Sequence, residues 1–243
     1  MVKEWDKAIP KLKFNAKNHT YKIGRKKLIP VSTLLSIYFG KVDAKVIARK
    51  VNKIPNSKYY KKGIRKILSE WKNISDNGTL VHKQIEDYIL FNIEPGHEKA
   101  KQAARFIDAE LDNYYEPLML TELQLYNERL GVAGTADLVV LDENDMRMTL
   151  YDWKTNNKID DKEYQKMHIP VKGLKNTKLQ KYQMQLSIYA YLLQLNGYKV
   201  RGINLVHLTG DKPKVYKLPL LTNIAKYMCE NYRRDEKNGK QKE

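Results

Sequence analysis

Three residues in the second half of the chain combine residue types and spacing that suit phosphate chemistry. Asp152 and Lys154 lie two apart in Leu150–Thr155, at the end of a segment predicted to be a β-strand, so both side chains project from one face. Trp153 lies between them and is expected to point the other way, into the core. A hairpin from the preceding predicted strand would bring Asp137 alongside Asp152. The sequence therefore predicts two carboxylates and one ammonium group converging at strand ends.

Such a group suggests a metal-assisted hydrolysis. Two clustered carboxylates repel each other unless a cation joins them, and hard oxygen ligands of this kind suit Mg²⁺ or Mn²⁺. A bound divalent ion lowers the pKa of its water and neutralises charge on a phosphoryl oxygen. A neighbouring lysine can orient or deprotonate that water, or stabilise the developing oxyanion. An Asp-x-Lys pair alone is more often a solvated salt bridge on a strand edge, so the hypothesis depends on the surrounding residues.

Further polar residues recur at spacings that would place them near this group. His82 and Glu86 are four apart on a predicted helix and share a face. The imidazole would add a third ligand and favour Mn²⁺, although a helical histidine is more often a packing or capping residue. Glu122 lies in the first predicted strand of the sheet, where it could equally be an exposed carboxylate. Gln185 and Tyr189 share a helix face, and a buried amide there needs hydrogen-bond partners.

The elements that must position these residues follow from periodicity and turn signals. Strands are predicted at Lys11–Phe14, Thr20–Ile23, Leu28–Val31, Met119–Tyr126, Val132–Leu141, Met148–Trp153, Val200–Leu208 and Val215–Leu218. Helices are predicted at Ser32–Phe39 (with Ser32 as the cap), Val42–Val51, Gly63–Ile74, Thr79–Phe91, His97–Tyr114, Leu179–Leu195 and Leu220–Arg233. The helix at 179–195 is expected to be strongly amphipathic. The polar stretch at 156–177 is expected to be a functional or partly disordered loop.

This order predicts an α/β fold, with a central mixed sheet flanked by helices and a basic, mostly helical N-terminal lobe. Residues 1–75 would form that lobe, residues 76–233 the core that carries the candidate catalytic residues, and residues 234–243 a frayed polar tail.

The net charge of +17 is concentrated in the first third of the chain. Residues 1–75 contain 20 Lys and Arg but 4 Asp and Glu. This asymmetry favours a polyanionic partner, with nucleic acid ahead of an anionic membrane surface, although lysine-rich faces also serve solubility. The predicted phosphate contacts are Lys61, Lys62, Arg65 and Lys66. Tyr59, Tyr60 and Trp71 would either stack on bases or form the core of the lobe.

Several classes of protein are disfavoured. No apolar run approaches the roughly 20 residues of a membrane helix, and the N-terminus has no signal-peptide character. Cys229 is the single cysteine, which excludes an intramolecular disulfide and an all-cysteine iron–sulfur site. An intracellular, cytoplasmic location is the default expectation.

Taken in order, these motifs resemble the PD-(D/E)XK nucleases of the RecB-like branch. The matching segments are GTLVH at 78–82 followed by Glu86, Glu122 followed by GVAGTAD at 131–137, DWKT at 152–155, and YQMQLSIY at 182–189. The resemblance implies His82, Asp137 and Asp152 as metal ligands, often joined by the Trp153 carbonyl. It also implies Lys154 as the catalytic lysine, and Gln185 and Tyr189 as a supporting helix motif.

The chain departs from the family pattern at two positions without losing a reacting group. Ala136 replaces the proline of the family name, and Trp153 replaces a tyrosine common before the lysine. The segments His19–Tyr21 and Ile29–Leu35 loosely resemble phage exonucleases and the mitochondrial genome maintenance exonuclease.

The resemblance predicts a Mg²⁺- or Mn²⁺-dependent deoxyribonuclease. An exonuclease acting on single strands or duplex ends in recombination, repair or phage replication is the first expectation, and the chain could be encoded by a phage or virus. A structure- or site-specific endonuclease shares the same site. An inactive nucleic-acid-binding module is the alternative from another class, and the intact Asp137, Asp152 and Lys154 set argues against it.

Overall fold

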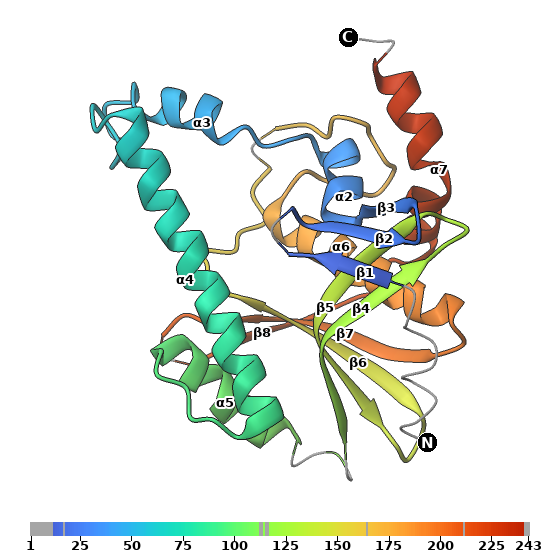
Figure 1. Ribbon diagram of the computed structural model, residues 1–243. Coiled ribbons are helices and arrows are strands. Elements are labelled where there is room, and N and C mark those ends of the chain that lie inside the picture. The colour runs from blue at the N-terminus through green and yellow to red at the C-terminus, as the bar shows by residue number, and fades with distance from the viewer. Residues whose placement is uncertain are drawn as a thin grey trace.

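A mixed β-sheet of eight strands lies at the centre of the protein in the computed structural model (Figure 1). The structure describes residues 12–16, 18–111, 114, 117–163, 165–210 and 212–240. Seven strands follow one another in the order β1-β2-β3-β5-β6-β7-β8, and β4 pairs with β5 beside this path. The strands are β1 (Leu12–Asn15), β2 (Thr20–Ile23), β3 (Lys26–Pro30), β4 (Leu118–Asn127), β5 (Val132–Asp142), β6 (Arg147–Lys154), β7 (Lys199–His207) and β8 (Lys214–Leu218).

Strand directions confirm the predicted mixed sheet. Strands β4, β5 and β6 form the two predicted antiparallel hairpins. The chain then crosses over through a helix, and β7 pairs with β6 in parallel. Strand β3 also joins β5 in parallel, through Ile29↔Val132 and Pro30↔Ala133. Because that pairing joins segments about 100 residues apart, local sequence signals did not predict it.

Helices cover both faces of the sheet. They are α2 (Val31–Phe39), α3 (Ala44–Val51), α4 (Ile64–Phe91), α5 (Glu98–Leu111), α6 (Lys178–Leu195) and α7 (Thr222–Lys240). Figure 1 shows α2, α6 and α7 grouped on one side of the sheet, with α4 and α5 on the other. Within the described ranges, no helix is both long enough and apolar enough to cross a membrane.

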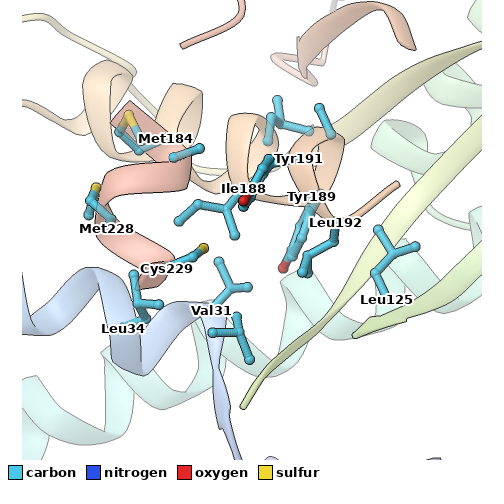
Figure 2. Packing of buried hydrophobic residues seen from close by; sticks show 14 of the residues in the cluster. Val31, Leu34, Leu125, Met184, Ile188, Tyr189, Tyr191, Leu192, Met228 and Cys229 are labelled. Carbon is cyan, nitrogen blue, oxygen red and sulfur yellow. The ribbon is translucent and has the colours of Figure 1, made fainter. Parts of the chain in front are cut away.

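The larger core cluster lies under α2, α6 and α7. Figure 2 shows Val31 and Leu34 of α2 meeting Ile188 of α6 and Met228 of α7 in this layer. Helix α6 contacts β4, β5, β6 and β7 on one side and α2 and α7 on the other. Its second half is therefore buried almost all round, and the predicted amphipathic pattern is wrong there. A helix packed between two layers needs no polar stripe.

The second core cluster lies under α4 and α5. Tyr151 and Trp153 of β6 pack there against Val81 of α4 and Ile107 of α5, whereas Leu150 belongs to the other cluster. Alternate residues of β6 thus enter opposite layers, as the period of a strand requires. The prediction that Trp153 points into the core is confirmed, and its ring packs edge-on against Phe106.

Three predicted helix limits are wrong. The two predicted helices at 63–74 and 79–91 are one helix of 28 residues, α4, which continues through the polar stretch around Gly78. Helix α2 begins at Val31 with Pro30 at the cap position, so Ser32 does not cap it. The predicted tail from residue 234 is helical as far as Lys240, because Asp235 is buried and accepts a hydrogen bond from Tyr38 of α2.

The described residues between 12 and 75 are divided between the core and a projecting part. Strands β1–β3 and helix α2 share the sheet and the larger core cluster, so this segment supplies strands as well as helices. Figure 1 shows α3 and the start of α4 standing away from the sheet. The predicted boundary between residues 75 and 76 falls inside α4.

The long connection between β6 and α6 has no helix or strand in its described residues. It is nevertheless tied to the core. Asn176 donates from its side chain to the carbonyl of Phe39 at 2.7 Å, and the amide of Ile169 donates to the carbonyl of Tyr38 at 3.0 Å. Thr177 then caps α6 by accepting from the amide of Gln180 at 3.1 Å.

Candidate metal centre

The candidate centre lies where β5 and β6 part. Their ladder begins at Leu138↔Tyr151, and Asp137 and Asp152 occupy the next positions on the two strands. There the Asp137 carboxylate accepts a hydrogen bond from the backbone N–H of Trp153 at 2.9 Å. A side chain thus satisfies a backbone donor at the point where the regular ladder ends. The bond fixes Asp137 beside the Asp152–Lys154 strand, which the sequence predicted from the hairpin.

An irregularity between β4 and β5 adds a third carboxylate. Regular pairs flank it at Thr121↔Leu138 and Leu123↔Ala136, and Glu122 lies opposite Asp137. Glu122 has a φ of 46°, a left-handed conformation that costs a non-glycine residue roughly 1–2 kcal/mol. Such outliers persist where the surroundings hold them, and they cluster at functional sites. Here the irregular backbone places an exposed glutamate next to the partly buried Asp137.

Helix α4 completes the group from the other layer. His82 Nδ1 lies 3.5 Å from Asp137 Oδ2. Donor atoms of His82, Glu122 and Asp137 all lie within 4.8 Å of one another. Glu86, one turn along α4, forms an ion pair with Lys83 at 2.9 Å and lies near enough to Glu122 to affect its pKa. The structure therefore brings the predicted ligands His82 and Asp137 together. It adds Glu122, which the sequence had placed in a supporting role.

Lys154 lies on the α6 side of the same centre. Its ammonium group contacts the Asp152 carboxylate, so the two residues share a face as predicted. The ammonium group also lies 4.6 Å from the ring centroid of Tyr182 on α6. A charge on one side and an aromatic face on the other favour the protonated lysine in a partly dehydrated position. Tyr182 had been assigned no function in the sequence, although its helical spacing from Gln185 was a signal.

Burial and mutual repulsion set the electrostatics of the carboxylates. Burial raises the pKa of Asp152 to about 6, with Asp137 adding to the rise against the opposing charge of Lys154. Glu122 is exposed at its surface, yet partial loss of water around its carboxylate raises the pKa to about 7, and Asp137 adds to the rise. Burial acts to raise the pKa of Asp137 too, but His82, Lys154 and the Trp153 amide outweigh it and hold that pKa below its usual range.

The two basic groups respond in the opposite sense. Burial acts to lower the pKa of His82, yet the adjacent Asp137 carboxylate raises it overall. Burial also acts to lower the pKa of Lys154, and Asp152 and Asp137 together more than offset it. The centre therefore holds an excess of negative charge that a cation would relieve.

The supporting helix motif has the partners it needs. Gln185 donates from its side-chain amide to the Tyr189 hydroxyl at 3.1 Å, so this amide has a hydrogen-bond partner on its own helix. Tyr189 in turn packs against Gly134 of β5, where an added Cβ would lie 2.4 Å from its ring. Gly134 thus lets α6 approach the strand that carries Asp137.

Two contacts near the centre were absent from the sequence predictions. Lys99 on α5 donates from its ammonium group to the carbonyl of Thr155, the residue after the predicted catalytic lysine. Gly78, inside α4, faces the Thr155 hydroxyl, which would lie 3.1 Å from a Cβ there. A glycine within a helix costs about 1 kcal/mol, and this close approach gives a packing reason for it. The family-like GTLVH segment offered that signal, but Lys99 offered none.

The predicted phosphate contacts lie far from the carboxylates along the chain, at the start of α4. This helix cluster comprises Lys61, Lys62, Arg65 and Lys66. Lys61, Arg65 and Lys66 are exposed, whereas Lys62 pairs with Glu70 at 2.6 Å. Tyr59 packs edge-on against Trp71, with ring centroids 5.7 Å apart, and both are partly buried. Tyr60 is exposed and lies under Lys61.

Comparisons with known proteins add little to this geometry. No protein-family model matches the sequence, and no curated protein matches it. Among solved structures, the crystal structure of SSO0001 is similar at 17% sequence identity and a TM-score of 0.39. The alignment covers 96% of this chain and 86% of the other. The candidate centre therefore has to be judged on its own residues.

Proposed function

We propose that the protein is a PD-(D/E)XK-type nuclease that uses Mg²⁺ or Mn²⁺ to hydrolyse phosphodiester bonds in DNA. One observation carries the proposal: two strands and a helix bring His82, Glu122 and Asp137 within 4.8 Å of one another beside the buried Asp152–Lys154 pair. Strand edges often carry one acid and one lysine. A convergence of three acids, a histidine and a lysine from four elements, with one acid buried and three of the groups partly buried, is much less common without a function.

The donor set fits a divalent cation. With Glu122, Asp137 and Asp152 ionised, Lys154 charged and His82 neutral, the group has two net negative charges. Carboxylate oxygens suit Mg²⁺, and the imidazole shifts the preference toward Mn²⁺. His82, Glu122, Asp137 and Asp152 would hold the ion, with the Trp153 carbonyl added by the family resemblance. A bound ion would lower the pKa of its water and neutralise charge on a phosphoryl oxygen.

The residues of the chain supply orientation and further charge. Asp152 and Tyr182 hold the Lys154 ammonium group in a fixed place. From there it would orient the attacking water or stabilise the negative charge that develops on the oxygens bound to phosphorus. The Trp153 amide and His82 fix the Asp137 carboxylate. These contacts exist before any substrate binds, as preorganised electrostatic catalysis requires.

A cavity beside the centre gives room for substrate. It has a volume of about 290 Å³, and it is lined in part by Tyr182, whose ring centroid lies 4.6 Å from the Lys154 ammonium group. Its polar lining consists of Ser32, Ser36, Lys181, Tyr182 and Gln185. Hydroxyl, amide and ammonium groups all donate hydrogen bonds to phosphate oxygens. The nucleotide next to the scissile phosphate would lie here.

The proposed substrate specificity is that of an exonuclease on single strands or duplex ends. The test incubates the protein with labelled DNA in four forms, circular and linear, each single- and double-stranded, in Mg²⁺, Mn²⁺, Ca²⁺ or EDTA. Cleavage of linear DNA in Mg²⁺ or Mn²⁺, with closed circles intact, is the expected result. Cleavage of circles would indicate the endonuclease alternative. Undiminished cleavage in EDTA after metal stripping, or no cleavage of any form, would overturn the proposal.

A matched control separates loss of chemistry from loss of structure. Asp142 lies at the other end of β5, is buried, and pairs with Arg201 at 2.7 Å. Asp142→Asn therefore removes a buried, paired carboxylate from the same strand as Asp137 but away from the centre. It should retain cleavage under conditions in which Asp137→Asn has none.

A further inference from the structure

Three lysines form a row across strands β1, β2 and β3. Lys13 is paired directly with Lys22, and Lys22 directly with Lys27, in the two antiparallel ladders. All three side chains are exposed. The lysine row therefore lies on one outer face of the three strands, one side chain per strand.

The opposite face of these strands fixes the row in place. Leu12, Tyr21 and Leu28 are buried there in a small cluster with Ala133 of β5. The Tyr21 hydroxyl also forms a hydrogen bond of 2.8 Å with the Thr135 hydroxyl, two residues before Asp137. Because side chains alternate along a strand, burying this set forces the lysines outward. The row is thus anchored to the strand that carries the candidate metal centre.

This arrangement has an uncompensated electrostatic cost. Like charges directly opposite each other in an antiparallel pair destabilise a sheet, and this row contains two such pairs in succession. Residues 7–42 include no Asp or Glu, so no nearby acid is available in the sequence. Across the part of the chain that the structure describes, no carboxylate forms an ion pair with Lys13, Lys22 or Lys27. An external polyanion would supply the missing negative charge.

We propose that the lysine row binds the sugar–phosphate backbone of the nucleic acid that the protein cleaves. Strands in a sheet are about 4.8 Å apart, so the row is about 10 Å long, which matches roughly three steps of 3.4 Å between the phosphates of one strand. Asn15 and Thr20 lie on the same face, two cross-strand pairs further along. Their uncharged polar groups suit contacts with phosphate and sugar oxygens.

A lipid surface is the other polyanion to consider, and this face fits it less well. Stable membrane attachment combines basic residues with apolar side chains that enter the bilayer interface. Most apolar side chains of these strands are turned to the buried side, and Ile29, which shares a face with Lys27, is partly buried against the larger core cluster. The outer face otherwise holds the lysines, Asn15 and Thr20. The choice of nucleic acid rests on the proposed function, whereas the prediction of a polyanion rests on the row itself.

The test compares a row variant, Lys13→Gln with Lys22→Gln and Lys27→Gln, with a control that loses the same charge elsewhere. The control is Lys217→Gln with Lys226→Gln and Lys237→Gln. These lysines are exposed on β8, at the opposite edge of the sheet, and on α7. Binding to a fluorescent single-stranded oligonucleotide and to a duplex is measured in EDTA over a range of salt concentrations. Because EDTA prevents metal-dependent cleavage, the result is independent of catalysis.

The row variant should have a salt dependence shallower by about 2 units of slope on the single strand, three contacts at about 0.7 each. The slope of the salt dependence should change much less in the control variant. The melting temperature of the row variant should equal or exceed that of the wild type, because repulsion between the lysines is relieved. If plots of affinity against salt concentration run parallel for the row variant and the wild type, the inference is overturned. Row-dependent binding to phosphatidylserine vesicles without binding to oligonucleotides would overturn it too. If the row variant loses affinity for the oligonucleotide while the wild type cleaves no DNA, binding by the lysine row is supported and the proposed nuclease activity is refuted.

Discussion

The candidate metal centre and the basic N-terminal surface use charge in opposite ways. In the centre, every charged group except the exposed Glu122 is partly or fully buried and touches a partner. The carboxylates of Glu122 and Asp152 have raised pKa values. On the surface, the lysine row and most of the helix cluster are exposed and have no acidic partner among the described residues. Arg65 and Lys66 even occupy the first turn of α4, where the helix dipole disfavours positive charge.

The difference separates binding from chemistry. Buried charges interact strongly over short distances and depend on exact partners, so single substitutions in the centre should have large effects. Exposed charges are screened by salt and act together, so each contributes a small and additive amount.

The largest expected effect is loss of cleavage in Asp152→Ala and Lys154→Ala. Each change removes one half of a buried ion pair that would act on the scissile phosphate. The cleavage rate should fall by about 10²- to 10³-fold or more, while DNA binding in EDTA persists. Cleavage rates are measured at saturating DNA, and circular dichroism checks that each variant is folded. Near wild-type rates in either variant would show that the centre is misplaced.

Metal affinity should rise with pH. Burial raises the pKa of Asp152 to about 6, partial loss of water raises the pKa of Glu122 to about 7, and Asp137 adds to both shifts. Both carboxyl groups must lose a proton to bind an ion, so affinity is low below these values and levels off above them. Titration with Mn²⁺ in calorimetry should show a gain of about 100-fold between pH 5.5 and 7.5. Glu122→Gln should flatten the upper part of that curve, and an affinity independent of pH would contradict both assignments.

His82→Ala should impair the reaction in a metal-dependent manner. The imidazole is the one nitrogen donor in the cluster, and Mn²⁺ holds the remaining ligands more tightly than Mg²⁺. The rate should fall by about tenfold or more in Mg²⁺ and recover in part in excess Mn²⁺. The matched control is Lys83→Ala, because Lys83 is the next residue of α4 and its side chain is exposed. Equal losses in the two metals would assign His82 to packing.

The smallest effects belong to the helix cluster. Counterion release gives about a fourfold loss of affinity per phosphate contact at 0.15 M salt on a single strand. Lys61→Gln, Arg65→Gln and Lys66→Gln should each approach that value. Lys62→Gln should lose less than twofold, because its charge is already engaged by Glu70 at 2.6 Å. Dissociation constants against salt for the four single variants would test this order. A Lys62→Gln loss equal to the others would mean that Glu70 releases Lys62 to the DNA.

Local sequence was enough for the parts of the centre that depend on strand period. Asp152 and Lys154 share a face, and Trp153 enters the core, because side chains alternate along any strand. The hairpin between β5 and β6 has a short polar turn, so the approach of Asp137 was also predictable. Most strands and helices lie within a few residues of their predicted limits for the same reason.

Contacts between distant segments were decided by the tertiary structure. Glu122 reaches His82 and Asp137 through a left-handed residue inside a strand, which no alternation pattern predicts. The burial of α6 on two sides and the joining of β3 to β5 likewise depend on where other layers pack. The sequence by itself determined which residues share a face, because that follows from backbone periodicity. Only the folded chain determined which faces meet, because long-range packing and non-local strand pairing set the distances between them.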